Sequence, residues 1–451
     1  MFFELMKKIA FTFLFLFSVS FFGYSQGTFV IQNKKKRDKI KFKLINNLVV
    51  IPVKINGVTL SFILDTGVSK PILFNIYNIH ETLKINNAEK IVIRGLGEGE
   101  SVEALRSRNN SIEIGEALNI GQDLFVVYNS KLDFAPKLGI PIHGIIGYDF
   151  FKDLVVEINY ASKVIKIHEN ETYTSKKCKK CEYLPLYFYN KKPYINAQVT
   201  MDDVKIPVKL LIDSGGSDAL WLFEDPSLGI NAHGNSFIDF LGHGLSGSVY
   251  GKRAKVEAFA INSFILKNAN VAFPEATSIS FAKNHKDRNG SIAGDILKRF
   301  RIVFNYQKAS IQLKKNKHFK EPFSYNKSGM ELEQNGIRLV REKDLSNSIK
   351  NQENTSSLDN GQGTRIVFDT NYKLAVKPAF TIVELRKDSP AEKAGLQVGD
   401  IIFRINGKET YNLTLQQMTQ YFYDKDGKHI KMKVDRFGEE LDFQFKLKSL
   451  F

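Results

Sequence analysis

Short apolar runs separated by turn residues follow one another along most of the chain. Residues 49–64 hold two such runs on either side of Asn56-Gly57, a dipeptide that favours a tight hairpin turn. A second pair of runs flanks Asp202-Asp203 in the same way. This pattern predicts strands paired in hairpins, and therefore a mainly β fold.

Helical patterns are rare in the first two thirds of the sequence. Only the stretches after Gly147 and Gly294 are typical of helices, and both are brief. We therefore expect short helices that follow strands.

Three segments of the chain recur later in the same order, which is the signature of an internal repeat. The pairs are residues 49–74 and 194–223, 95–99 and 242–247, and 144–167 and 290–313. The offset is 148 residues between the aspartates of the first pair and 147 residues for the other two pairs. We expect two homologous β lobes, residues 30–170 and 182–315, with a linker at 171–181 and a cleft between the lobes.

Residues 316–451 differ in character and predict a third, β-rich domain with one or two helices. A flexible insertion is expected near 344–363, where Ser, Asn, Gln and Gly dominate. Ser389 can cap a short helix that begins at Pro390 and ends at Gly395. Further expected elements are a turn at Asn406-Gly407, a helix at 414–423 and closing strands at 429–449.

The first 25 residues predict export. Lys7 and Lys8 precede an apolar run from Ile9 to Phe22, and small or polar residues follow it. This order is typical of a cleaved secretory signal peptide, and an uncleaved N-terminal anchor is the alternative. We expect a periplasmic or secreted protein whose association with a membrane is peripheral at most.

The formal net charge of +16 is scattered along the chain. Its densest runs, Lys34–Arg37, Lys176–Lys180 and Lys314–Lys320, lie at the expected domain junctions. Solvated linkers explain them better than attraction to anionic surfaces. A nucleic-acid binder would gather the charge in a stripe with stacking aromatic residues, so no nucleic-acid partner is expected.

The cysteines and histidines predict no metal site. Cys178 and Cys181 lie in a lysine-rich stretch and cannot complete a zinc site alone, so a local disulfide is the better interpretation. His80-Glu81 and His168-Glu169 both lack the second histidine of a zinc peptidase helix. The glycines at 95–99 lack the helix of a dinucleotide site, so no cofactor is expected.

Asp65 and Asp213 are the candidate catalytic residues, because each follows an apolar run in one of the two repeats. Two carboxyls held close together share one proton, so one can activate a water while the other polarises a peptide carbonyl. Four neighbours are expected to support them. Thr66 and Ser214 would anchor each loop to the other lobe, and Gly67 and Gly215 would let the backbone turn sharply.

These residues resemble the pepsin and retropepsin superfamily of aspartic proteases over about 280 residues. Asp65-Thr-Gly matches its first motif, and Asp213-Ser-Gly-Gly-Ser through Trp221 resembles its second. Ile-Ile-Gly147 and Ile-Ala-Gly294 resemble the element behind each active-site loop. The resemblance implies aspartic endopeptidase activity on peptides or proteins.

The resemblance also implies mobile flaps at the two glycine-rich stretches. The candidate flap residues are Gly95, Gly97, Gly242 and Gly244. Neither stretch has the tyrosine of a pepsin flap, which favours the two-flap arrangement of retropepsins. His243 could touch substrate or be an ordinary loop residue, and Trp221 could line a subsite or belong to the core.

Residues 380–407 resemble a bacterial-type PDZ domain through Ser389-Pro-Ala and the following Ala-Gly-Leu, Gly-Asp and Ile-Asn-Gly. Such a domain implies a groove for an extended peptide, used for substrate recruitment or regulation. Retention for structure or self-capping is the other interpretation. A non-catalytic peptide-binding or scaffold protein with the protease fold remains the alternative to an enzyme.

Overall fold

The computed structural model describes residues 27–450 apart from 77–82, 98, 129–132, 176, 233, 281, 283–286 and 344–371. The expected signal peptide and the expected insertion near 344–363 lie outside the described residues. Strands make up 53% and helices 8% of the structure, so the prediction of a mainly β fold is confirmed.

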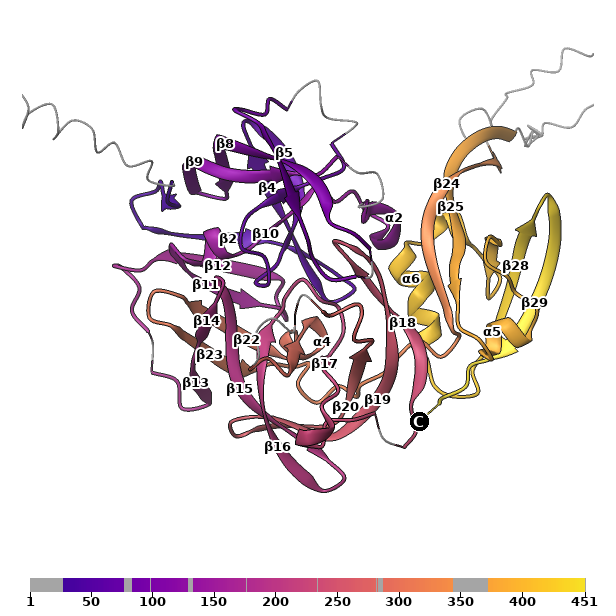
Figure 1. The fold of residues 1–451 in the computed structure, drawn as a ribbon. Helices are drawn as coiled ribbons and strands as arrows, with labels where there is room; N and C mark the ends of the chain where they lie inside the picture. The colour runs from indigo at the N-terminus through magenta and orange to yellow at the C-terminus, as the bar shows by residue number, and fades with distance from the viewer. Residues whose placement is uncertain are drawn as a thin grey trace, which may run out of the picture.

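The strands of lobe 1 close into a ring around an apolar core (Figure 1). In order of pairing, the ring consists of β4 (Leu48–Ile55), β5 (Val58–Leu64), β10 (Gly144–Ile146), β6 (Ile72–Leu73), β9 (Ala117–Val126) and β8 (Val102–Ile114), which pairs again with β4. The strands β1 (Val30–Ile31), β3 (Lys43–Ile45) and β7 (Glu89–Ile93) extend its sheet. The turn between β4 and β5 is Asn56-Gly57, as predicted, with φ of 45° and 91°.

Lobe 2 contains a second ring with the same order of pairing. It consists of β15 (Lys192–Met201), β16 (Val204–Ile212), β21 (Gly290–Ile292), β17 (Leu220–Leu222), β20 (Phe264–Pro274) and β19 (Gly247–Ile261), which pairs again with β15. The additional strands are β14 (Tyr187–Tyr189) and β18 (Phe237–Gly244), and η2 (Pro226–Leu228) is a single 3₁₀ turn. In both rings the strand before the aspartate pairs in parallel with a three-residue strand.

A third sheet joins the two lobes, and no pattern in the sequence predicted it. Its order is β13 (Cys181–Pro185), β23 (Ser310–Lys315), β22 (Phe300–Asn305), β11 (Leu154–Asn159), β12 (Val164–Glu169) and β2 (Arg37–Lys41). The lobes meet where β11 pairs with β22, with Val156 opposite Phe304 and Ile158 opposite Ile302. One continuous hydrophobic core therefore runs through both lobes.

The predicted short helices are present at the start of this sheet. Helix α3 (Tyr148–Phe151) precedes β11, and helix α4 (Gly294–Leu297) precedes β22. Each consists of a single turn.

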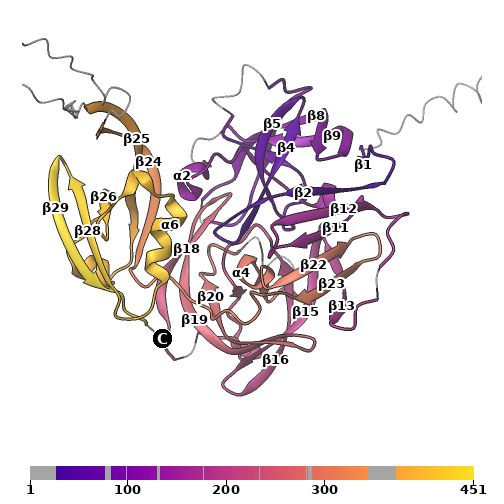
Figure 2. The ribbon, with the colours of Figure 1, turned by 180° about the vertical axis from the view of Figure 1, so that it is seen from behind.

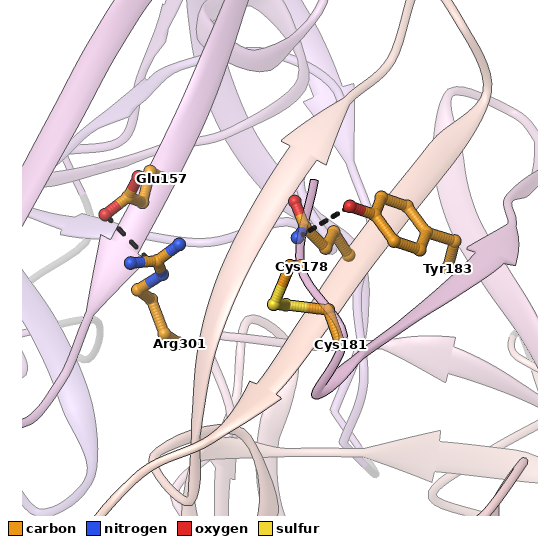
Figure 3. Close-up of a disulfide and its surroundings, with 6 residues drawn as sticks. Glu157, Cys178, Cys181, Tyr183 and Arg301 are labelled. Carbon is orange, nitrogen blue, oxygen red and sulfur yellow. Dashed lines mark hydrogen bonds and ion pairs between the residues drawn. A yellow bond between two sulfur atoms is a disulfide. The ribbon is translucent and has the colours of Figure 1, made fainter. Parts of the chain in front are cut away.

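Cys178 and Cys181 form the predicted local disulfide beside β13 (Figure 3). Nearby, Arg301 lies 3.8 Å from the carboxylate of Glu157, and Tyr183 accepts a hydrogen bond from Gln312. The disulfide thus lies on the sheet that joins the lobes.

The C-terminal domain has its own core and its own sheet. The sheet order is β24 (Met330–Lys343), β25 (Tyr372–Leu385), β26 (Ile401–Ile405), β28 (His429–Arg436) and β29 (Glu439–Lys446), and β27 (Lys408–Glu409) pairs with β26. The helical elements are α5 (Pro390–Lys393), α6 (Leu415–Gln420), and the 3₁₀ turns η4 (Thr410–Asn412) and η5 (Tyr421–Tyr423). The predicted Ser389 cap is present, since its hydroxyl accepts the amide of Glu392 at 3.2 Å.

The C-terminal domain lies against one side of the two-lobed body. In both ribbon views, α6 faces helix α2 (Ala135–Leu138) of lobe 1 and strand β18 of lobe 2 (Figures 1 and 2). The domain therefore contacts both lobes.

Candidate active site

Asp65 and Asp213 are the first residues after two strands that occupy equivalent places in the rings. Asp65 follows β5 and its amide donates to the carbonyl of Ile146 at 2.8 Å. Asp213 follows β16 and its amide donates to the carbonyl of Ile292 at 2.9 Å. Each aspartate is therefore held by the parallel strand beside it.

Thr66 and Ser214 lock the two loops together by reciprocal hydrogen bonds. The Thr66 hydroxyl donates to the carbonyl of Ile212 at 2.6 Å and accepts the Ser214 amide at 3.0 Å. The Ser214 hydroxyl donates to the carbonyl of Leu64 at 2.7 Å and accepts the Thr66 amide at 3.0 Å. Both hydroxyls are buried and each reaches into the other lobe, in the way that the sequence predicted.

Gly67 and Gly215 leave the space into which the two carboxyls fit. A methyl group added at Gly215 would lie 2.3 Å from the Asp65 carboxyl carbon, closer than any real contact. One added at Gly67 would lie 3.0 Å from Oδ1 of Asp65 and 3.3 Å from Oδ1 of Asp213. The two oxygens therefore approach a common point, and their separation cannot exceed the sum of these two distances.

Backbone hydrogen bonds also hold each carboxylate to its own loop. The Gly67 amide donates to Oδ1 of Asp65 at 2.6 Å, and the Gly215 amide donates to Oδ1 of Asp213 at 3.2 Å. The arrangement is a pair of facing carboxyls in matched loops.

The structural equivalence of the elements behind the loops is shifted by one residue from the 147-residue offset that relates Gly147 to Gly294 in the sequence. Gly147 is the N-cap of α3, and the N-cap of α4 is Ala293 rather than Gly294. Across from these residues lie Val68 in lobe 1 and Gly216 in lobe 2. A methyl group at Gly147 would meet Val68, and one at Gly216 would lie 3.0 Å from the Ala293 side chain. In lobe 1 the loop residue Val68 has the side chain and the N-cap Gly147 has none. In lobe 2 the loop residue is Gly216 and the N-cap Ala293 has the side chain, so glycine and side chain have exchanged positions.

The site favours protonation of its carboxyls. Burial raises the pKa of Asp65 to about 7, and the negative charge of Asp213 adds to this rise, while the Gly67 amide and Lys192 oppose it. Burial also raises the pKa of Asp213, against the opposing charges of Arg288 and Lys192. The pair therefore retains a proton in mildly acidic solution.

Lys192 and Arg288 are site residues that sequence reasoning missed. Lys192 is the first residue of β15, where the equivalent first residue of β4 is Leu48. The buried Arg288 donates from Nε to the carbonyl of Gly290 at 3.1 Å, and its guanidinium lies 5.1 Å from the centre of the Phe223 ring. No motif marks either residue, because their positions depend on how β15 and β21 pair with β16.

The candidate flap glycines lie in hairpins whose tips meet. Gly95 and Gly97 lie in the loop between β7 and β8, and Gly244 ends β18 at the tip of the β18–β19 hairpin. The Ser246 amide donates to the Leu96 carbonyl at 2.9 Å. A methyl group at Gly97 or Gly244 would collide with the opposite tip. Gly242 lies lower in the hairpin, beside a bulge in the pairing of β18 with β19.

The tip leucines cross from one lobe to the other. Leu245 of lobe 2 packs on a lobe 1 cluster that includes Leu48 and Phe74. Leu96 of lobe 1 packs on a lobe 2 cluster that includes Phe223 and Ile279. The two candidate flap tips therefore contact each other, and each packs on the opposite lobe.

His243 and Trp221 contact neighbours within the fold. The His243 ring stacks edge-on against Phe240 at 4.7 Å, and burial lowers its pKa to about 4. Trp221 packs partly buried against the β18–β19 hairpin, and its ring nitrogen donates to Asp218 at 2.7 Å. Neither side chain is fully exposed.

No cluster of three or more His, Cys, Asp or Glu residues that could hold a metal occurs in the described part of the chain. The described residues also include no helix with the length and hydropathy needed to cross a bilayer.

Comparisons with known proteins support both resemblances. Residues 51–150 match the aspartyl protease family, and residues 381–436 match the PDZ domain family. A protein of Staphylococcus haemolyticus (strain JCSC1435), named "Probable CtpA-like serine protease", is 35% identical over 60 residues. That match covers 13% of this chain and 12% of the relative's length. The chain thus contains an aspartyl protease-like segment and a C-terminal PDZ domain, and it is related to proteases.

Proposed function

We propose that the chain is an aspartic endopeptidase whose single active site uses Asp65 and Asp213 as one dyad. The observation that carries the proposal is the reciprocal hydrogen bonding of Thr66 and Ser214. These bonds hold two facing carboxyls in one chain, so a monomer supplies both. The name of the matching relative states a serine mechanism for that protein, whereas the aspartic mechanism proposed here rests on this chain's own residues.

In the proposed reaction the two carboxyls share one proton. The ionised carboxyl takes a proton from a water molecule while the water oxygen attacks the peptide carbonyl carbon. The protonated carboxyl donates to the carbonyl oxygen, so that a tetrahedral diol forms. The protonated carboxyl then donates its proton to the leaving nitrogen as the C–N bond breaks, and the other carboxylate takes a proton from a diol hydroxyl as the product carboxyl forms, so the dyad again holds one proton.

The closed flaps give the proposed enzyme a gate. Leu96 and Leu245 must separate before an extended peptide can reach the aspartates, because each leucine packs on the opposite lobe. Flap opening is therefore a required step of the proposed cycle. Apolar wall residues beneath the flaps would exclude water from the closed complex.

The direct test is cleavage of a peptide library by the full chain across pH, with and without a transition-state inhibitor of aspartic proteases. Cleavage that the inhibitor blocks and that chelators and serine or cysteine alkylating agents leave unchanged is expected. If no peptide is cleaved at any pH, the chain is better explained as a non-catalytic peptide-binding protein that retains the fold.

We also propose that the enzyme works after export, with residues 1–25 removed as a signal peptide. Mass spectrometry of protein purified from its native host is expected to lack these residues, and an intact Met1 would contradict this.

A further inference from the structure

The C-terminal domain has one sheet edge on which an extended peptide could pair. Strand β24 is the edge strand of the sheet, and α6 packs beside its first half. A strand edge flanked by a helix is the arrangement by which PDZ domains take up extended peptides. We name the space between β24 and α6 the edge groove.

In this structure the edge groove is covered by lobe 1. The side-chain amide of Gln416, on α6, donates to the carbonyl of Leu138 at 2.6 Å. A methyl group added at Gly139 would lie 2.8 Å from the Leu415 side chain of α6 and 3.8 Å from Gln334 of β24. Gly139 therefore lies between the two walls of the groove, and Figures 1 and 2 show α2 beside α6 from opposite sides.

The local sequence of lobe 1 suits this contact. Pro136 is the second residue of the single turn of α2, and Gly139 caps the end of this turn with φ 63° and ψ 18°. Leu138 is 6% exposed and anchors the turn in the lobe 1 cluster that also receives the flap residue Leu245. The chain can approach α6 closely only because Gly139 has no side chain.

The end of the groove offers no free amides for the terminal carboxylate of a peptide. The side-chain oxygen of Asn326 accepts the amides of Ser328 at 3.0 Å and Gly329 at 3.3 Å. The amide of Met330 donates to the Ser328 hydroxyl at 3.1 Å. All three amides at the start of β24 are thus satisfied within the chain, which argues against capture of a C-terminal peptide there.

A second contact ties the same domain to the flap of lobe 2. Glu384 accepts a hydrogen bond from the Tyr250 hydroxyl at 2.9 Å, and Arg386 lies 3.4 Å from Asp239 on β18. Arg253 bonds Asp239 at 2.8 Å and also bonds Asp218, which lies in the chain just after the Asp213 loop. The ion pairs therefore run from the C-terminal domain through the flap hairpin to the segment that follows the Asp213 loop.

We propose that the C-terminal domain is an intramolecular clamp: its edge groove holds the α2 turn of lobe 1, while Glu384 and Arg386 hold the β18–β19 flap hairpin of lobe 2. The clamp favours the closed flaps, because it holds lobe 1 and the β18–β19 hairpin together. Leu245, at the tip of that hairpin, packs on lobe 1 when the flaps are closed. Its effect on turnover rests on the proposed peptidase function, whereas the docking itself does not.

Hydrogen exchange of the full chain tests the docking, with the variants Gly139→Asn and Gly229→Asn as a matched pair. Both glycines end a one-turn helix with left-handed backbone, which asparagine tolerates. A side chain at Gly139 strikes Leu415, whereas one at Gly229 meets only Ile206 at an ordinary 3.6 Å. In Gly139→Asn alone, we expect amides of α6 and of residues 330–334 to exchange about tenfold faster.

Unchanged exchange in Gly139→Asn, or the same change in Gly229→Asn, would overturn the clamp. If Gly139→Asn does not fold, Gln416→Ala replaces it, with the exposed Gln420→Ala on the same helix as its control. Gln416→Ala removes the bond to Leu138 and should produce a smaller increase at the same amides.

Peptide turnover then separates this inference from the proposed function. We expect Gly139→Asn to raise kcat/KM for a short fluorogenic peptide several-fold, because its flaps open more readily. Turnover below the parental rate would contradict the closing role of the clamp. If Asp65→Asn retains turnover, the proposed dyad is wrong. The hydrogen-exchange result would still test the clamp independently.

Discussion

The two candidate active-site loops have the same hydrogen bonds but different electrostatic surroundings. Thr66 and Ser214 make equivalent reciprocal bonds, so the backbone of the site is nearly symmetric. Beyond the loops, lobe 1 places the apolar Leu48 where lobe 2 places Lys192, and Arg288 adds a second cation near Asp213. A repeated fold can therefore hold two identical groups in position while their surroundings make them chemically unequal.

The strongest test replaces either aspartate. Asp65→Asn and Asp213→Asn are each expected to lower kcat by roughly three orders of magnitude or more, because a shared proton needs both carboxyls. Steady-state cleavage of a fluorogenic peptide measures this. Asp203→Asn, in an exposed turn, is the control that should keep parental activity. An active single variant would show that the lobes do not act as a pair.

The reciprocal hydrogen bonds of Thr66 and Ser214, which we call the hydroxyl lock, should contribute most of the stability at the interface of the two loops. Thr66→Val or Ser214→Ala removes two buried hydrogen bonds and leaves their partners unsatisfied, which costs about 2–4 kcal/mol. Chemical denaturation measures the loss. Ser227→Ala, which removes an exposed hydroxyl bond to Asp225, should change stability little. Unequal losses in the two lock variants would show that the lobes do not share the lock equally.

The exchanged glycines should respond differently in the two lobes. Gly216→Val is expected to cost about 1–3 kcal/mol through crowding against Ala293, and Ala293→Gly should recover part of it. Gly147→Ala should not be rescued by Val68→Gly, because the added methyl would lie 1.9 Å from the Asp65 carbonyl oxygen. Denaturation of the single and double variants tests both statements. If the stability losses of Gly216→Val and Ala293→Gly simply add in the double variant, the two positions do not compensate each other, which would contradict this interpretation.

Asp65 should make stability fall as pH rises toward neutral. Its pKa in the folded chain is about 7, above its ordinary value of 3.8, so between these values the folded state binds more protons than the unfolded state. The stabilising contribution is complete below about pH 4 and is lost as pH passes 7. Asp65→Asn should flatten this part of the curve of unfolding free energy against pH. A curve of unchanged slope would show that burial does not raise this pKa.

Lys192 should set the alkaline side of the activity profile. Its positive charge lowers the pKa of both aspartates, so Lys192→Leu, which copies Leu48, should raise them. We expect the alkaline limb of kcat/KM to move to higher pH, with a smaller change at the optimum. Lys205→Leu, on an exposed part of β16, is the control. An alkaline limb at the same pH in Lys192→Leu would mean that the charge of Lys192 does not affect the pKa of the two aspartates.

The sequence alone was enough to propose the residues of the candidate site, and it determined most of the local structure. Asp65 and Asp213, their hydroxyl and glycine neighbours and the hairpin turns could be predicted, because a turn or a strand end depends on residues close in the chain. The Ser389 cap and the disulfide between Cys178 and Cys181 are local in the same sense.

The tertiary structure decided what depends on residues far apart. Three features have no local signature: the sheet formed by β11 and β22, the cations Lys192 and Arg288 near the two aspartates, and the one-residue shift that pairs Gly147 with Ala293. The same holds for Gly139, whose lack of a side chain matters only because α6 packs against it. Composition and periodicity report which face of an element is buried, but packing of whole elements chooses the neighbours that set a pKa or fill a groove.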